Sequence, residues 1–307
     1  MAESTNPPFW SVMLPVFRPE ADYLKRALGS VLEQDPGSAD MQISVIDDAS
    51  PDVDSEQIVK SAAGHRVQFL RNETNLGLAG CWNRCVQLAR GQWVHILHQD
   101  DYLLPGFYKR MQKAASDHPN ADLIAARSFE VDGAGIIVAI TPRIPTLENG
   151  GTSVSEFYYT NPLRCPGVAV KREFYELRGG FRRDLTFTLD WEMWTRVISN
   201  GSGVVLPEIL TAYRYSGKNE AARLCSSGEA FEDRSRLNKI LAERYPDFDS
   251  RRAHRETCRS AIAHADGFRD AGDLKGATAN LAFWNRNATV KQKCWRALDS
   301  FVRRVIG

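Results

Sequence analysis

Two pairs of adjacent aspartates in this 307-residue chain stand where apolar runs end. Asp47 and Asp48 follow "QISVI", and Asp100 and Asp101 follow "QWVHILHQ". Carboxylates gathered at one place repel each other unless a cation lies between them. A Mg²⁺ or Mn²⁺ ion held by one or two carboxylates keeps open positions for phosphate oxygens. Turn capping by aspartate explains one such pair equally well, but two pairs at predicted strand ends favour a metal and phosphate site.

The elements that must position these aspartates alternate between residues 10 and 118. Apolar runs of strand length are followed by segments in which apolar residues recur with helical spacing. The expected strands cover 10–17, 42–47, 67–72 and 92–98, and the expected helices cover 20–34, 55–64, 78–91 and 105–118. This alternation predicts a mainly parallel sheet with helices on both faces. Ligands bind outside the carboxyl ends of such strands, so both aspartate pairs are expected on one rim.

The pattern changes after this alternating part. A strand over 121–131 and a hairpin turn at 132–135 are expected, followed by a looser region. Residues 203–216 have the pattern of an extended segment, and Pro207 indicates that this segment is an edge strand. From residue 220 onward the sequence is helical and polar, with no strand pattern.

Composition and charge narrow the functional class. With 43% hydrophobic and 25% charged residues the chain is an ordinary globular protein. It has no apolar run near twenty residues and no signal-peptide pattern at residues 1–8, so a cytoplasmic protein is expected. Its six cysteines form no CxxC pair, which argues against zinc or thiol redox chemistry. Basic residues number 27 against 33 acidic ones in residues 1–250, but 12 against 5 in 251–307, so the basic end is expected to meet an anionic surface.

An ordered set of motifs resembles family 2 glycosyltransferases of the GT-A fold. The motifs span about residues 10–215 and read "LPVFRPEADYLKRALGSVLEQ", "ISVIDDASPD", "NETNLGLAGCWNRCVQLARGQWVHILHQDDYLLPGF", "KREFYELRGGF" and "LDWEMWTRVI". The resemblance implies an inverting enzyme that moves a sugar from a nucleotide-sugar, with a UDP-sugar as the expected donor, to an acceptor hydroxyl. It also implies a GT-A catalytic domain at 1–216, with a nucleotide-binding half at 9–131 and an acceptor half at 132–216. A C-terminal helical region at 217–307 would follow.

By this resemblance, several short segments contact the donor nucleotide. Asp48 matches the aspartate that accepts a hydrogen bond from the base. The other positions that the resemblance places at the nucleotide are Pro15, Val16, Phe17, Asn75, Gly77, His98, Gln99, Arg214 and Lys218. Phe17 stands where the family more often has tyrosine, and Arg214 and Lys218 stand in the late loop over the diphosphate.

The resemblance also assigns a metal ligand and a base. Asp100 falls on the metal-binding aspartate of the family's D-x-D-D stretch, which reads HQDD here. His98 replaces the first aspartate of that stretch, so it is expected to donate to a ribose hydroxyl, to join the metal shell with Asp101, or to pack as a core histidine. Asp190 falls on the catalytic aspartate, after Leu189 instead of the usual glutamate. A base at this position takes the acceptor proton.

Three functions remain open on the sequence alone. The first is a glycosyltransferase that needs Mn²⁺ or Mg²⁺ and acts on a glycan or lipid-linked acceptor of surface polysaccharide or glycolipid synthesis, with no nucleic acid as partner. The second is an inactive glycosyltransferase-like subunit that binds nucleotide or glycan; His98 supports it, whereas Asp48, Asp100 and Asp190 oppose it. The third is a nucleotidyltransferase, although "LPVFRPEADY" lacks the glycine-rich basic loop of such enzymes.

The last segment, 291–307, has the pattern of a basic amphipathic helix. Its apolar stripe consists of Trp295, Leu298, Phe301, Val302 and Val305, with lysines and arginines on either side. Helices of this kind lie in membrane interfaces, so peripheral contact with the inner face of the cell membrane is one expectation. Packing of the stripe on the catalytic domain, or on a second copy in a homo-oligomer, is the other.

Overall fold

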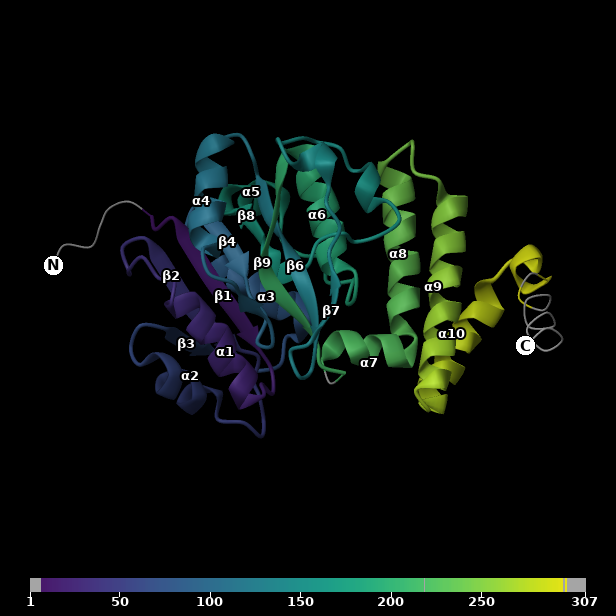
Figure 1. Ribbon diagram of the computed structural model, residues 1–307, viewed down its shortest axis with the longest axis horizontal. Helices are drawn as coiled ribbons and strands as arrows, with labels where there is room; N and C mark the ends of the chain where they lie inside the picture. The colour runs from purple at the N-terminus through teal and green to yellow at the C-terminus, as the bar shows by residue number, and fades with distance from the viewer. Residues whose placement is uncertain (1–6, 218, 295, 297–307) are drawn as a thin grey trace. The chain divides into compact units, whose positions relative to one another are not determined.

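The computed structural model describes residues 7–217, 219–294 and 296, and the chain divides into two compact units, 1–217 and 218–307. The first unit is built around one nine-stranded sheet, and the described residues of the second unit form helices (Figure 1). The mixed α/β class and the C-terminal helical extension expected from the sequence are both confirmed.

Parallel strands form the half of the sheet that carries the aspartate pairs. β1 (Trp10–Val16) lies between β2 (Met41–Asp47) and β4 (Trp93–Ile96), and β3 (Gln68–Arg71) lies beyond β2 at the edge. Almost every residue of β1, β2 and β4 is buried. Strands that are covered on both faces need such continuous apolar runs, which explains why these three were readable from the sequence.

The other half of the sheet is mixed. β8 (Val168–Lys171) runs antiparallel to β4 and to β6 (Leu123–Asp132), so β6 runs in the same direction as β4. β9 (Gly203–Tyr215) pairs parallel with β6, and the two-residue strand β5 (Tyr102–Leu103) pairs with β9. A short antiparallel strand, β7 (Ile137–Ile140), completes the expected hairpin with β6. The end of β6 therefore reaches the rim on which β1, β2 and β4 end.

The expectation that residues 203–216 form an edge strand is wrong. β9 pairs with β6 along most of its length and also with β5 at Thr211 and Ala212. The register between β6 and β9 shifts between Leu206 and Ile209, and Pro207 lies in this irregular step. Because proline cannot donate to a regular ladder, a bulge is the place within a sheet that tolerates it.

Helices cover both faces of the sheet (Figure 1). One core cluster joins β1 and β2 to α1 (Ala21–Leu32), α2 (Ser55–Ala63) and α4 (Phe107–Asp117). In α1, residues Leu24, Ala27, Leu28 and Val31 are buried, the spacing of a helix that lies on a sheet. The remaining helices of the first unit are α3 (Gly77–Leu88), which contacts β1 and β4, α5 (Arg172–Arg178) and α6 (Leu189–Asn200).

The second unit contains α7 (Glu220–Ser227), α8 (Glu229–Arg244), α9 (Ser250–Asp270) and α10 (Leu274–Asn287). Asn219, Asp249 and Asp273 cap three of these helices through side-chain acceptors. Its small core includes Phe231, Cys258, Ala261, Phe283 and Trp284. No described helix combines the length and the apolar composition that a membrane span needs. The apolar stripe predicted in 291–307 lies outside the described residues.

Candidate active site

The two aspartate pairs lie on one rim, as the alternating pattern predicts. β2 and β4 flank β1 and run parallel to it. The Asp48 N–H donates to the Val16 carbonyl at 2.8 Å, and the Leu97 N–H donates to the Met13 carbonyl at 3.0 Å. The chain therefore leaves three neighbouring strands at the same edge, where the carboxyl ends of parallel strands form a binding crevice.

Asp47 holds this rim together. Its side chain is fully buried and accepts from the Ser50 hydroxyl at 2.5 Å and from the Ser50 N–H at 3.3 Å. Arg71 forms an ion pair with it at 3.1 Å. A carboxylate engaged in this way is a structural group, so only the second aspartate of the pair faces the crevice with unused capacity.

Asp48 keeps one carboxylate oxygen available. Its Oδ1 accepts from the Asn72 side chain at 2.8 Å and from the Leu76 N–H at 2.9 Å. No hydrogen bond from the described residues reaches its Oδ2. Asn75 donates to the Asp48 carbonyl at 3.1 Å and accepts from the Gly77 N–H, so Asn75 and Gly77 shape this loop. The loop thus fixes the Asp48 carboxylate and leaves an acceptor for a ligand N–H.

Two apolar side chains stand exposed beside Asp48. Phe17 is 40% exposed, and Leu76, which the sequence reading missed, is 45% exposed. Pro15 is half-buried, whereas Val16 is 2% exposed and packs in the core, so the side chain of Val16 cannot contact a nucleotide here. Exposed apolar groups next to a fixed acceptor suit a flat heterocycle, which needs both a stacking surface and a polar partner.

Gln99, a predicted nucleotide contact, links two loops of the rim through its side chain. Its side-chain oxygen accepts from the Phe17 N–H at 2.8 Å, and its side-chain nitrogen donates to the Phe17 carbonyl at 3.1 Å. These two hydrogen bonds fix the loop after β1 to the loop after β4. In this arrangement Gln99 acts on the nucleotide site through Phe17.

Backbone strain is concentrated at the same rim. Arg18 has a φ of 47° and Ala49 a φ of 59°, values that side-chain-bearing residues rarely adopt. Each follows the end of a strand, and the Ser50 hydroxyl accepts from the Arg18 N–H at 2.8 Å. Strained residues of this kind cost about 1–3 kcal/mol each and cluster at functional sites.

A candidate metal site follows the end of β4. His98, Asp100 and Asp101 each offer a ligand atom, and these atoms all lie within 4.8 Å of one another. Asp101 Oδ2 and His98 Nε2 are buried and make no hydrogen bond in the described part of the chain, although His98 Nδ1 lies within ion-pair distance of that oxygen. Buried polar atoms are normally paired, so these residues fit a bound cation, and their carboxylate oxygens are ligands that Mg²⁺ and Mn²⁺ prefer.

His98 is coupled to Asp101 and lies beside an aromatic ring. Its Nδ1 lies 3.3 Å from Asp101 Oδ2, and its ring centroid lies 4.9 Å from that of Trp82. Burial lowers the pKa of His98, but the Cys165 sulfur and the Asp101 carboxylate outweigh burial and hold that pKa well above its ordinary value. The imidazole and the Asp101 carboxylate therefore form an ion pair here.

In this structure the Arg214 side chain joins two backbone segments to each other. This position does not fit the expected contact of Arg214 with the diphosphate. The side chain is 1% exposed. Its guanidinium donates to the carbonyls of Asp100 at 3.0 Å, Asp132 at 3.0 Å and Gly133 at 3.1 Å. The backbone N–H of Arg214 donates to Asp101 Oδ1 at 2.8 Å. Arg214 thereby fixes the metal-site loop to the β6–β7 hairpin. Lys218, its expected companion, lies outside the described residues.

Asp190 stands in the first turn of α6, half-buried. Its Oδ1 accepts from the Trp191 N–H at 2.7 Å, and its Oδ2 accepts from the Asn161 side chain at 3.0 Å. Burial raises its pKa above the ordinary value for aspartate, although the Trp191 N–H and the charges of Arg164 and His98 oppose the rise. These electrostatic effects link Asp190 to the His98 loop, and a raised pKa makes a carboxylate a better proton acceptor.

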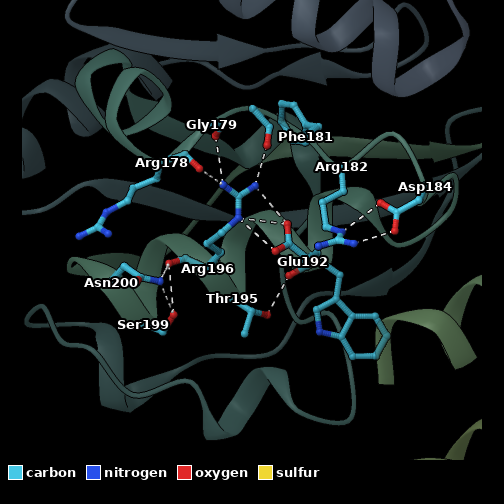
Figure 2. Close-up of polar contacts among 12 residues, drawn as sticks. Arg178, Gly179, Phe181, Arg182, Asp184, Glu192, Thr195, Arg196, Ser199 and Asn200 are labelled. Atoms are coloured by element: carbon cyan, nitrogen blue, oxygen red, sulfur yellow. Dashed lines mark hydrogen bonds and ion pairs between the residues drawn. The ribbon is translucent and has the colours of Figure 1, made fainter. Parts of the chain in front are cut away.

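The helix that carries Asp190 is anchored by a buried ion pair (Figure 2). Arg196 Nε lies 3.0 Å from Glu192 Oε1, and Glu192 is 1% exposed. The Arg196 guanidinium also donates to the carbonyls of Arg178, Gly179 and Gly180 at 2.6–3.0 Å. This network joins α6 to the turn after α5 and so fixes the start of α6.

Sequence reasoning missed the polar residues that surround Asp190. Besides Asn161, these include Arg164, whose charge acts on Asp190 and which forms an ion pair with Glu130 at 2.6 Å. Arg164 also lies over the ring of Tyr213, 5.7 Å from its centroid. None of these residues belongs to a short motif, and the sequence signal closest to them is the apolar strand that follows "NPLRCPG".

Comparison with known proteins identifies the family. Residues 11–173, more than half of the chain, match the profile of glycosyl transferase family 2. The chain belongs to this family. It is therefore a glycosyltransferase, and it is similar to several proteins of that activity by name. It is 24% identical over 224 residues to the uncharacterized glycosyltransferase MJ1057 of Methanocaldococcus jannaschii, covering 71% of this chain and 75% of the relative. It is 23% identical over 255 residues to the poly(ribitol-phosphate) beta-N-acetylglucosaminyltransferase TarS of Staphylococcus aureus, covering 80% of this chain and 42% of TarS.

Solved structures show the same fold. The crystal structure of S. aureus TarS 1-349 in complex with UDP-GlcNAc matches with a TM-score of 0.62 and 17% identity, over 91% of this glycosyltransferase and 81% of that chain. The mannosyltransferase PcManGT from Pyrobaculum calidifontis, solved with GDP-Man and Mn²⁺, matches with a TM-score of 0.57 and 17% identity, over 97% and 81% of the two chains. The GT-A fold expected from the sequence is confirmed.

Proposed function

We propose that this glycosyltransferase transfers a sugar, with inversion, from a UDP-sugar to an acceptor hydroxyl in the synthesis of a surface polysaccharide or glycolipid. One observation carries the proposal: a single rim brings an available acceptor at Asp48 together with the cluster of His98, Asp100 and Asp101, and the charge of His98 acts on the base candidate Asp190. The structure of TarS in complex with UDP-GlcNAc supports a uridine donor.

Asp48 and its apolar neighbours would bind the donor base. Oδ2 of Asp48 accepts from a ring N–H, since Oδ1 is engaged by Asn72 and Leu76. Phe17 and Leu76 supply the apolar contact, and Asn75 and Gly77 hold the loop that carries them. Pro15 and the backbone of Val16 border the same place.

Asp100 would be the main protein ligand of a Mn²⁺ or Mg²⁺ ion, with Asp101 Oδ2 and His98 nearby. When bound, such an ion stabilises the negative charge of the departing diphosphate. Arg214 holds the Asp100 backbone in place, and the hydrogen bond of Gln99 with the Phe17 backbone keeps the same loop against the nucleotide site. The PcManGT structure with Mn²⁺ supports metal use in this fold.

Asp190 would act as the base. As the acceptor oxygen attacks the anomeric carbon, its proton passes to a carboxylate oxygen of Asp190, and the bond between that carbon and the diphosphate oxygen breaks. Attack from the face opposite the leaving group inverts the anomeric centre. Asn161 and the Trp191 N–H orient the carboxylate, and positioned bases contribute on the order of 10²–10⁴-fold.

Release of nucleoside diphosphate tests this function. A panel of UDP-, GDP- and dTDP-sugars is offered with Mn²⁺, with Mg²⁺ and with a chelator, and the released nucleotide is identified. We expect UDP release that needs the metal and is lost in Asp100→Ala. Release of pyrophosphate would indicate a nucleotidyltransferase, and nucleotide binding without any release would indicate an inactive binding subunit. Either result would contradict the proposal.

We also propose peripheral attachment to the inner face of the cell membrane through 291–307, which would bring the enzyme to a lipid-linked acceptor. A cytoplasmic location and a homo-oligomer remain predictions. Light scattering of the full-length protein tests the second, because a single-chain mass would contradict it.

A further inference from the structure

Helix α9 carries four arginines near its beginning. They are Arg251, Arg252, Arg255 and Arg259, and all four are exposed. Three of them follow one another at intervals of four residues, so they form a row along one side of the helix. The buried side of α9 packs against α8 and α10. The arginine row therefore forms the solvent side of the second unit at this point.

The turn after α10 adds a cation and an apolar side chain to this row. Gln292 donates to the Arg255 carbonyl at 3.3 Å, which holds the turn against α9. The turn itself is closed by the N–H and hydroxyl of Thr289, which both donate to the Gln292 side-chain oxygen at 3.0 Å. Val290 is 78% exposed, and Lys291 is exposed beside it. We call Arg251, Arg252, Arg255, Arg259, Val290 and Lys291 the basic patch.

The acidic residues near the patch do not neutralise it. Glu256 forms an ion pair with Arg259 at 3.4 Å, and Asp249 accepts from the Arg252 N–H at 2.9 Å as the helix cap. Within residues 7–217, 219–294 and 296, no ion pair involves Arg251, Arg255 or Lys291. Three exposed positive charges are thus available to an external anion.

We propose that the basic patch binds the phosphate headgroups of an anionic lipid bilayer. Several cations on a convex helix suit phosphates spread over a plane better than one small anion, which needs converging donors. The exposed Val290 beside Lys291 favours a bilayer over nucleic acid, because apolar side chains enter the headgroup region while arginines and lysines meet the phosphates. The proposal deepens the proposed function, which makes membrane docking useful, but it rests on residues outside 295–307.

Cosedimentation of the full-length protein with vesicles tests the patch. We expect binding to phosphatidylcholine vesicles that contain phosphatidylglycerol, and little binding to phosphatidylcholine alone. R251E/R255E should lower the partition coefficient at least roughly thirtyfold, because each basic residue near an anionic surface contributes about fivefold and the new glutamates add repulsion. The matched control K60E/K109E makes the same change in net charge at two exposed lysines of the first unit and should bind as wild type does. Val290→Ser should weaken binding with little change in its salt dependence.

Several results would overturn the proposal. These are wild-type binding by R251E/R255E, an equal loss in K60E/K109E, or binding of a DNA duplex in preference to anionic vesicles. R251Q/R255Q, which removes charge without reversing it, serves if the glutamate variant is unfolded by circular dichroism. Release of nucleotide with a water-soluble acceptor is measured on the same variants. Intact vesicle binding without transfer would refute the proposed function but not the role of the basic patch. Intact transfer without vesicle binding would refute the role of the basic patch but not the proposed function.

Discussion

The hydrogen bond from Asn161 to Asp190 should set the pH at which this glycosyltransferase loses activity. Replacing Asn161 by alanine removes the donor 3.0 Å from Asp190 Oδ2 and leaves the Trp191 N–H on the other oxygen. Burial already raises the pKa of Asp190, and the Asn161 amide opposes that rise. Loss of the amide therefore raises the pKa further.

The size of the shift follows from the strength of this bond. A hydrogen bond to a charged group contributes about 1.5–3 kcal/mol, and a shift of one pKa unit corresponds to about 1.4 kcal/mol. An unreplaced bond would thus be equivalent to about one to two pKa units. Since Asp190 is half-buried, water replaces part of the lost bond, and we expect about one unit.

The assay is the pH dependence of kcat/KM. The active base is ionised, so activity falls as the pH drops through the pKa of Asp190. In Asn161→Ala this fall should begin at a pH about one unit higher than in wild type, with the rate at higher pH little changed. Asn200→Ala is the control, because its amide bonds the Arg196 carbonyl and the Ser199 hydroxyl on the same helix. An unchanged acidic limb together with a lower Tm would show that Asn161 only stabilises the fold.

Three further substitutions test the groups around the site. Arg214→Ala removes donors to three backbone carbonyls. It should lower the free energy of unfolding in urea by about 3 kcal/mol and weaken Mn²⁺-dependent UDP binding. Unchanged metal dependence would contradict the conclusion that Arg214 holds the metal-site loop in place. Glu192→Ala leaves Arg196 buried without its counter-charge and should cost about 3–5 kcal/mol of stability, so a near-zero change would refute the anchor. His98→Ala should weaken UDP binding by roughly 1 kcal/mol in calorimetry; an effect on stability alone would favour a core histidine.

The sequence alone predicts the position of those site residues that follow directly from the order of the strands. Asp48 and Asp100 follow buried parallel strands, and the alternation of strands and helices places such ends on one rim. The edge strand that Pro207 predicts is wrong, because an irregular step between two paired strands also accommodates proline.

The roles of Arg214 and Gln99 depend on contacts between segments far apart in the chain. Arg214 donates to backbone carbonyls of residues 100, 132 and 133, and no local pattern encodes these acceptors. Gln99 is likewise bonded to the backbone of Phe17, which any residue type at position 17 except proline would offer. Asn161 lies in an irregular segment without periodicity, so its approach to Asp190 emerges only from tertiary packing.

The most direct test of the central claim is single-turnover transfer by Asp190→Asn with the donor that the panel identifies. An amide cannot accept the acceptor proton, whereas it keeps the size of the carboxylate and the approach of the Trp191 N–H. We predict that the fold and the calorimetric affinity for the donor are retained while the transfer rate falls on the order of 10²–10⁴-fold. Transfer by Asp190→Asn at a rate near that of the wild type would contradict the assignment of Asp190 as the base and the mechanism built on it.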